Sequence, residues 1–450
     1  MINLLEQKDF EYLSEKRFFV IGILLCGIVM TFSLLGGNQV WSSSIEPNSK
    51  FNFSDTYDLS NNQNDSVYGQ ISSLDKNNLA LVWQDSNFKI TGSNLIDRNY
   101  DIFFENFDLN GIIKDDRLNL SNNPGFSEHP HMAVSGNNTY IAWIDNSENV
   151  KQVYFRHSEN TGQDFYNTTI LSSNESQASN VDVSAESNFV YVTWQEKNLD
   201  HSSVILRISS DFGKTFGDEK VLSNYSSDSY PRIFSQNGTV FVTWNIDVIK
   251  SSDPFNYNNA ISSEINPGIY FTMSRDEGNT FGAPQLLSNA SDFSYGEAQV
   301  SAFNNYVYVS WVQKDSPLTF GNLYVAKSAD YGNNFERIEI QLKPDNIFDA
   351  SNLDTFAYGD KLFLALEASV NTTASLNVGM KKEGGFNKEI FFTVLSQNLT
   401  SPKEMFNLSE NPGISECPSI SLLPNEKIVS VSWEDYTPGN HEILMRQVHY

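Results

Sequence analysis

Beyond residue 50 the chain alternates short apolar runs with polar, turn-forming stretches, and no long helical periodicity occurs. The runs are rich in Val, Ile, Tyr, Phe and Thr, which is typical of β-strands joined by turns. One strand type recurs and ends in tryptophan; its copies end at Trp83, Trp143, Trp194, Trp244, Trp311 and Trp433. A seventh copy, around Leu364, has lost the tryptophan. Spacings of about 50 to 67 residues between successive copies of this strand predict four-stranded propeller blades.

A second strand in each unit leads into a box of the form S-x-D-x-G-x-x-F. The good copies contain Ser209, Asp211, Gly213 and Phe216; Ser274, Asp276, Gly278 and Phe281; and Ser328, Asp330, Gly332 and Phe335. A weaker copy at 158–165 has Asn160 in place of the aspartate, and the stretch at 381–386 is degenerate. Ser and Asp accept backbone N–H groups in turns, Gly supplies a positive φ, and the phenylalanine is expected to plug the blade beneath it. The box is therefore predicted to be structural.

Each unit ends with an outer strand whose last two residues are Leu-Ser. One such strand is left over at the N-terminal end of the repeats, and one is missing at the C-terminal end. The first such pair, Leu59-Ser60, precedes any tryptophan strand, whereas the last unit stops at Tyr450 without an outer strand. The N-terminal strand is predicted to fill that vacancy and to close the ring, which removes an exposed sheet edge. We expect an all-β propeller of seven four-stranded blades, or six if the region around Leu364 is an insertion.

The boxes and the VxVxW strands together resemble the Asp-box (BNR) repeats of the sialidase superfamily. The last unit, Trp433-Glu434-Asp435 followed by residues 438–443, resembles the repeat of exported archaeal sialidase-like propellers. The resemblance covers nearly all of residues 51–450. It implies a propeller fold and is weakly specific for activity, because one fold hosts many functions.

The N-terminus predicts an export signal that stays in place. Phe18 to Leu35 is uncharged and apolar, Lys16 and Arg17 precede it, and no Lys or Arg follows until Lys50. This pattern predicts a cytoplasmic segment 1–17, a transmembrane signal-anchor helix 18–36, a linker 37–50 and an extracytoplasmic propeller 51–450. A cleaved signal peptide is the alternative, and it would also export the domain. The expected location is the cell membrane, with a single pass.

The net charge and the absence of known motifs limit the classes of ligand that we expect. The formal net charge of -26 disfavours nucleic acid, because phosphates attract basic surfaces. We find no nucleotide-binding, zinc-protease or nucleophile-elbow motif, and expect no cofactor and no metal. The expected partners are the membrane, through the N-terminal helix, and a glycan or a cell-surface protein.

A sialidase-like active site implies three arginines around a carboxylate, a Tyr–Glu nucleophile pair and an Asp acid/base. Of the arginines, we expect only Arg232 on an innermost strand; Arg156, Arg207 and Arg446 share a third-strand position, which indicates a repeated surface feature. Carboxylates expected at inner-strand starts are Glu128, Asp182, Glu297 and Glu416. Those two residues past a tryptophan, Asp85, Asp145, Glu196 and Asp435, recur in phase, which favours a structural role in turns.

Three further features are candidate ligand contacts. His129 and His131 flank Pro130 at the start of an inner strand, and alternation predicts that both face the same side. Two histidines at this spacing without a clear third ligand are weak support for a metal site. The insertion at 250–267 carries Phe255 and Tyr257 and is expected to form a long loop over the scaffold. The candidate ligand-binding residues are Arg232, Glu128, His129, His131, Glu297, Phe255 and Tyr257.

These observations favour a non-catalytic recognition propeller at the cell surface. An exo-α-sialidase-like glycoside hydrolase and a structural component of the cell envelope remain as alternatives. No catalytic residue is assigned.

Overall fold

The computed structural model describes residues 40–41, 51–91, 95–198, 201–225, 228–246, 267–289, 294–314, 319–342, 346–370, 387–402, 404–437 and 439–450. They belong to one compact unit, Gln39–Tyr450. The predicted segments 1–17 and 18–36, and most of the linker, lie outside the described residues. Among the residues that the structure describes, no helix is long and apolar enough to cross a bilayer.

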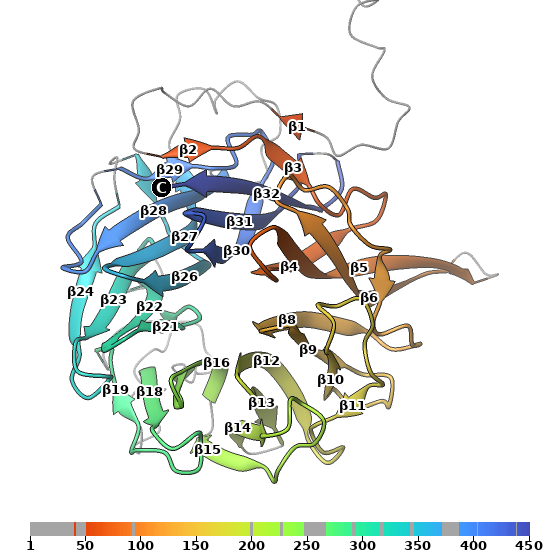
Figure 1. Cartoon of the computed structure of the whole chain (residues 1–450), viewed down its shortest axis with the longest axis horizontal. Coiled ribbons are helices and arrows are strands. Elements are labelled where there is room, and N and C mark those ends of the chain that lie inside the picture. The colour runs from red at the N-terminus through yellow and green to blue at the C-terminus, as the bar shows by residue number, and fades with distance from the viewer. Residues whose placement is uncertain are drawn as a thin grey trace, which may run out of the picture. The chain divides into compact units, whose positions relative to one another are not determined.

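Seven antiparallel sheets are arranged in a ring (Figure 1), which confirms the prediction of a seven-bladed propeller. We number the blades in chain order from the first complete sheet and give strands from the innermost outward. Blade 1 is β4 (Ser66–Ser73), β5 (Asn78–Thr91), β6 (Leu95–Asp108) and β7 (Leu118–Asn119). Blade 2 is β8 (Ser127–Ser135), β9 (Asn138–Asp145), β10 (Gln152–Ser158) and β11 (Thr169–Ile170). Blade 3 is β12 (Gln177–Glu186), β13 (Phe189–Lys197), β14 (Ser202–Ser209) and β15 (Lys220–Tyr225).

The remaining blades follow the same order. Blade 4 is β16 (Asp228–Gln236), β17 (Thr239–Ile246), β18 (Gly268–Ser274) and β19 (Gln285–Leu286). Blade 5 has a divided inner strand, β20 (Ser294–Tyr295) and β21 (Gln299–Phe303), then β22 (Tyr306–Lys314), β23 (Asn322–Ser328) and β24 (Glu336–Ile340). Blade 6 is likewise β25 (Ile347–Phe348) and β26 (Leu353–Tyr358), then β27 (Lys361–Val370), β28 (Lys388–Ser396) and β29 (Phe406–Asn407). Blade 7 is β30 (Ser415–Leu423), β31 (Ile428–Asp435) and β32 (Glu442–His449).

The N-terminal strand closes blade 7, as the end pattern predicts. In β3 (Thr56–Asp58), Tyr57 pairs with Met445 of β32, and β2 (Asn52–Phe53) pairs with the end of the same strand. The N-terminal strands thereby cover the edge of β32, and this edge would be exposed in an open array of blades. A further strand, β1 (Val40–Trp41), pairs with β3 and lies inside the stretch assigned as linker.

The repeated tryptophans lie between the blades, fully buried. Five of them donate an indole N–H, at 3.0–3.2 Å, to the side chain two residues later: Asp85, Asp145, Glu196, Gln313 and Asp435. The four carboxylates of this set lie on strands, and Asp85, Asp145 and Asp435 are buried. The expectation that they lie in turns is therefore wrong, whereas the expectation of a repeated structural role is right. In blade 6, Leu366 pairs with Phe391 as Trp143 pairs with Tyr154, so Leu366 occupies the tryptophan position.

The Leu-Ser pair fastens the outer strand to the third strand. In blade 2, Leu171 N donates to Val153 O at 2.8 Å, and Ser172 Oγ accepts Val153 N at 2.8 Å. The equivalent serine bond recurs at Ser121, Ser288, Ser409 and Ser60. Each leucine fills the core while its serine completes the hydrogen bonding of the third strand where the outer strand ends.

The boxes form one repeated turn. Ser209 Oγ accepts Gly213 N at 2.9 Å, and Asp211 Oδ1 accepts Thr215 N at 2.9 Å. Corresponding bonds occur in the copies that begin at Ser158, Ser274 and Ser328. The terminal phenylalanines contact the preceding blade; Phe216, for example, packs edge-on against Phe155, with ring centroids 5.0 Å apart. The box therefore connects neighbouring blades as well as closing its own hairpin.

Candidate functional site

The innermost strands share an irregularity at the same point. In five blades the pairing with the second strand shifts, and the extra residue has φ of 50–52°: Tyr68, His129, Asn180, Tyr230 and Cys417. The inner strands of blades 5 and 6 are divided at the corresponding place. Positive φ is unfavourable for residues other than glycine, and bulges of this kind redirect side chains. The bulges lie at the starts of the innermost strands. The turns between the first and second strands lie at the other end of each blade, and so do the boxes: Ser328, where a box begins, pairs with Val307 near the start of the second strand. We call the bulge end the mouth.

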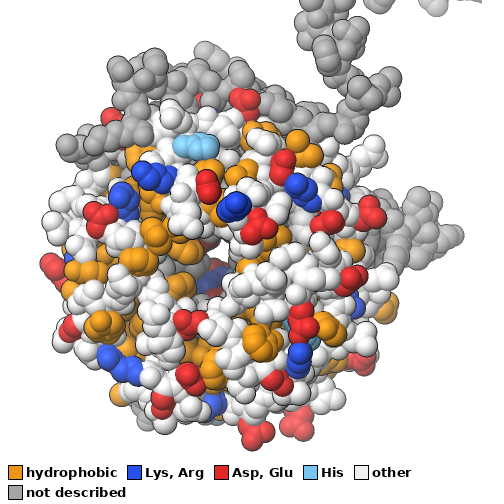
Figure 2. Space-filling model, viewed as in Figure 1, with side chains coloured by type: hydrophobic (Ala, Val, Ile, Leu, Met, Phe, Trp, Pro, Cys, Tyr) orange, Lys and Arg blue, Asp and Glu red, His pale blue; other side chains and the backbone are white. Residues whose placement is uncertain are grey.

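Two residues after each bulge, a polar side chain reaches the next blade. Gln70 Oε1 accepts Met132 N at 3.1 Å, Asp182 Oδ2 accepts Ile233 N at 2.8 Å, and Ser419 Oγ accepts Ile71 N at 3.3 Å. In blade 6, Asp354 Oδ2 accepts Ile420 N at 2.9 Å in the same way. His131 and Arg232 occupy the equivalent positions in blades 2 and 4. These residues form a polar girdle around the axis of the ring, where Figure 2 shows a hollow.

Arg232 lies in this girdle among carboxylates. Its side chain, 9% exposed, forms an ion pair with Glu297 of blade 5, and its Nε has no hydrogen-bond partner among the described residues. Burial works against its charge, but Glu297 and Asp182 together raise the pKa of Arg232. Burial also opposes ionisation of Asp182, yet the hydrogen bond from His131 (Nδ1–Oδ1, 3.0 Å) and the charge of Arg232 lower its pKa overall. Burial raises the pKa of Asp354 to about 6.

The mouth holds five glutamates that interact electrostatically with one another or with the bulge residues: Glu128, Glu297, Glu367, Glu416 and Glu434. The neighbouring cations are already paired, because Lys151 contacts Glu128, Lys388 contacts Glu367, and Arg232 contacts Glu297. Lys388 Nζ also lies 3.7 Å from Glu416 Oε1. The mouth therefore has more carboxylates than cations.

Glu434 is the most confined of these carboxylates apart from Glu367, which is fully buried. Its Oε2 accepts the bulge N–H of Tyr68 at 3.1 Å. Burial, with the charges of Glu416 and Glu367, raises the pKa of Glu434 to about 7. Burial and nearby carboxylates also raise the pKa of the Cys417 thiol well above its ordinary value, which disfavours a nucleophilic role.

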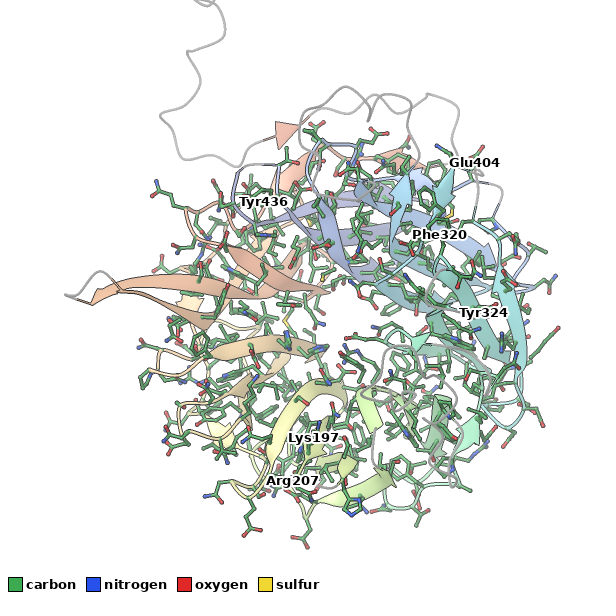
Figure 3. The ribbon with its side chains drawn as sticks, turned by 180° about the vertical axis from the view of Figure 1, so that it is seen from behind. Lys197, Arg207, Phe320, Tyr324, Glu404 and Tyr436 are labelled. Carbon is green, nitrogen blue, oxygen red and sulfur yellow. The ribbon has the colours of Figure 1, made fainter. Side chains whose placement is uncertain are left out.

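Aromatic side chains accompany the carboxylates. Tyr68 is 42% exposed and Tyr230 is 36% exposed, and Tyr68 packs edge-on against His129 with ring centroids 4.3 Å apart. Phe320 and Tyr436, labelled in Figure 3, are exposed in the connections that follow β22 and β31 at the same end. Exposed rings beside carboxylate acceptors suit a ligand with both apolar faces and hydroxyl groups.

The structure brings together five of the seven candidate ligand-binding residues: Arg232, Glu128, His129, His131 and Glu297. His129 and His131 do not share a face by simple alternation, because the bulge separates them; His129 packs on Tyr68, and His131 bonds within the girdle. Phe255 and Tyr257 lie outside the described residues. In the part of the chain that is described, no group of three or more His, Cys, Asp or Glu is arranged to hold a metal ion.

The remaining arginines of the propeller are not on innermost strands. Arg98, Arg156, Arg207 and Arg446 are on third strands, Arg337 is on a fourth, Arg275 is in a box, and Arg117 adjoins β7. The expected surface role of Arg446 is wrong, because it is 1% exposed and its Nη1 donates to Leu408 O of the preceding blade. Arg207 donates to Leu171 O in the same way, so these side chains connect blades.

Sequence reasoning missed Tyr68, Tyr230, Cys417 and Glu434 as members of the site. A signal existed, because His129, Tyr230 and Cys417 each precede a proline in phase, and proline suits a bulge, where no ladder N–H is required. The approach of Glu434 to Tyr68 joins residues 366 positions apart and has no local signature.

Comparison with known proteins finds similarity in structure alone. No protein-family model and no curated protein sequence matches the chain. A Dyadobacter fermentans protein of unknown function is 13% identical, with a TM-score of 0.52 over 89% of this chain and 99% of that one. A Trypanosoma rangeli sialidase in complex with the inhibitor DANA is 12% identical, with a TM-score of 0.43 over 76% of this chain and 57% of that one. An N10 neuraminidase-like protein of a little yellow-shouldered bat influenza A virus is 10% identical, with a TM-score of 0.45 over 72% of this chain and 95% of that one.

The architecture defines the class of the molecule, a seven-bladed β-propeller closed by its own N-terminal strand. The Dyadobacter fermentans protein, with a TM-score of 0.52, is similar to this chain in fold over nearly its whole length. At these identities the likeness concerns the fold, and function has to be argued from the mouth itself.

Proposed function

We propose that the chain is a cell-surface recognition protein that binds glycans at the mouth of the propeller without hydrolysing them. The observation that carries this proposal is the combination of exposed tyrosines on strained bulges with a surplus of carboxylates. Tyr68 and Tyr230 offer ring faces to the apolar side of a sugar, and Glu128, Glu297 and Glu416 offer acceptors to its hydroxyl groups. The apolar segment 18–36 would anchor the domain to the membrane.

The arginine arrangement supports binding without sialidase chemistry. That chemistry requires several guanidinium groups to converge on a carboxylate, and among the described innermost strands only Arg232 supplies one. Its charge is already compensated by Glu297 and Asp182.

A glycan array tests the proposal, with the chain compared against Tyr68→Ala and Tyr230→Ala. Loss of an aromatic stacking surface is expected to weaken binding about tenfold in each variant. The matched control is Tyr331→Ala, because Tyr331 is 53% exposed but lies in the box of blade 5, at the opposite end. Binding that is absent throughout the array, or that only the control variant loses, would contradict the proposal.

A hydrolase is the second candidate, and one observation favours it. Burial raises the pKa of Glu434 to about 7, and Glu416 lies opposite it on the neighbouring strand. Two neighbouring carboxyl groups, one of them with a raised pKa, are what glycoside hydrolysis uses. Hydrolysis of a glycoside that Glu434→Gln abolishes would establish this alternative.

A further inference from the structure

Glu434 has an unused acceptor. Its side chain is 10% exposed, and its Oε2 is bonded to Tyr68 N. The other oxygen, Oε1, accepts no hydrogen bond from the described residues. His441 Nδ1 lies 3.9 Å from it and likewise has no hydrogen-bond partner among them. Oε1 is not among the buried side-chain atoms that lack a partner, so it is open to solvent and can accept a hydrogen bond from a ligand.

The surroundings determine which kind of donor fits. Glu416 lies directly opposite Glu434 on the neighbouring strand. Lys388 Nζ is 3.7 Å from Glu416 Oε1 but is in contact with Glu367, and the only other basic side chain near the pair among the described residues is His441, 3.9 Å from Glu434 Oε1. Arg232, at the axis, is paired with Glu297. An anionic sugar would meet net repulsion here, whereas a cation would relieve the repulsion among the glutamates.

We propose that the mouth selects glycans that carry a protonated amine, and that this ammonium group binds between Glu434 Oε1 and Glu416 while Tyr68 stacks on the sugar ring. The ligand class is therefore an amino sugar with a free amine. This inference rests on glycan binding at the mouth and adds the chemical class of the sugar.

Titration calorimetry of the solubilised full-length chain tests this selectivity with two matched probes. The trisaccharide of glucosamine carries free amines, and the trisaccharide of N-acetylglucosamine has the same rings without the charges. We expect the glucosamine probe to bind at least tenfold more tightly at low salt, and the difference to shrink as salt screens the interaction.

Glu434→Gln separates charge recognition from general sugar binding. The amide keeps an acceptor for Tyr68 N, so the fold is expected to persist, and only the glucosamine probe should lose affinity, by about tenfold. Glu404→Gln is the matched control, because Glu404 is exposed at the outer rim of the ring (Figure 3) and should change neither affinity.

The outcomes separate this inference from the proposed function. Equal affinity for the two probes, or equal losses for both in Glu434→Gln, would overturn the amine preference and leave glycan binding intact. Failure of every sugar to bind, with the chain folded, would instead overturn the proposed function and the inference with it.

Discussion

At the residue scale, the same left-handed backbone conformation recurs at two kinds of position, the boxes and the bulges of the innermost strands. Within the boxes, Gly213, Gly278 and Gly332 have φ of 79–85° and lie against side chains of the preceding blade. At the mouth the same left-handed conformation is held by tyrosine, histidine and cysteine instead. Glycine would relieve that strain, so the retention of larger residues there is consistent with a role for their side chains.

Gly278→Ala should destabilise the fold by about 1–3 kcal/mol, because it combines positive φ with a close contact. An added Cβ would lie 2.5 Å from Ile208 Cδ1 of the preceding blade. Gly282→Ala, four residues on, is the control, because its nearest atom would be 3.8 Å away. Denaturant unfolding of both variants measures the difference, and equal stabilities would refute the interblade role of the box.

Glu434→Gln should stabilise the protein at pH 8 by about 3 kcal/mol. The native pKa of Glu434, about 7, lies above its ordinary value of 4.5, so the native state loses stability as pH rises between these values. Removal of the charge therefore helps above pH 7 and has no effect below pH 4.5. Thermal melts at pH 4.5 and 8 measure this, and a gain of the same size at both would show that the electrostatic explanation is wrong.

At the element scale, the sequence predicted strands better than it predicted their irregularities. The tryptophan strands, the Leu-Ser ends and the ring closure all carry local signatures that recur, because each blade buries the same core positions. The bulges do not, since register depends on pairing between strands. The girdle depends on still longer contacts; Asp182 and Ile233, for example, are 51 residues apart. Glu128, Asp182, Glu297 and Glu416 were therefore found only as residues at strand starts, without their partners, and Glu434 was not found.

Ring closure can be tested by truncation. Residues 39–450 should fold, because the compact unit begins at Gln39. Residues 61–450 lack β2, β3 and Ser60, whose hydroxyl bonds Ile443 N at 2.8 Å and contacts Glu442. The edge of β32 is then uncovered, which should promote aggregation and lower the melting temperature. A 61–450 fragment as stable and monodisperse as 39–450 would refute closure by the N-terminal strand.

At the scale of the whole molecule, stability should increase as pH falls from 8 to 5. Burial raises the pKa of Glu389, Glu434 and Glu442 to about 7, and that of Asp58 and Asp354 to about 6. A raised native pKa stabilises the fold below the ordinary pKa, and this stabilisation is lost as pH rises through the native value. The box aspartates act oppositely at lower pH, because their hydrogen bonds hold the pKa of Asp276 and Asp330 at about 2. Melting temperatures between about pH 3 and pH 8 should therefore pass through a maximum near pH 4 to 5, and a steady rise toward pH 8 would contradict this.

The features of the mouth are the basis of the proposed function, which is to bind a ligand without transforming it. The propeller supplies a rigid ring, the bulges set aromatic and carboxylate groups around its axis, and the axial arginine, Arg232, is neutralised by its neighbours. Recognition without turnover is the central claim.

Release of fluorophore from a panel of fluorogenic glycosides, α-sialosides included, tests that claim most directly. We predict no turnover by the folded chain, even for glycosides whose sugars bind at the mouth. Sustained hydrolysis of any member of the panel, abolished by Glu434→Gln and unaffected by Glu404→Gln, would contradict it and identify the mouth as an active site.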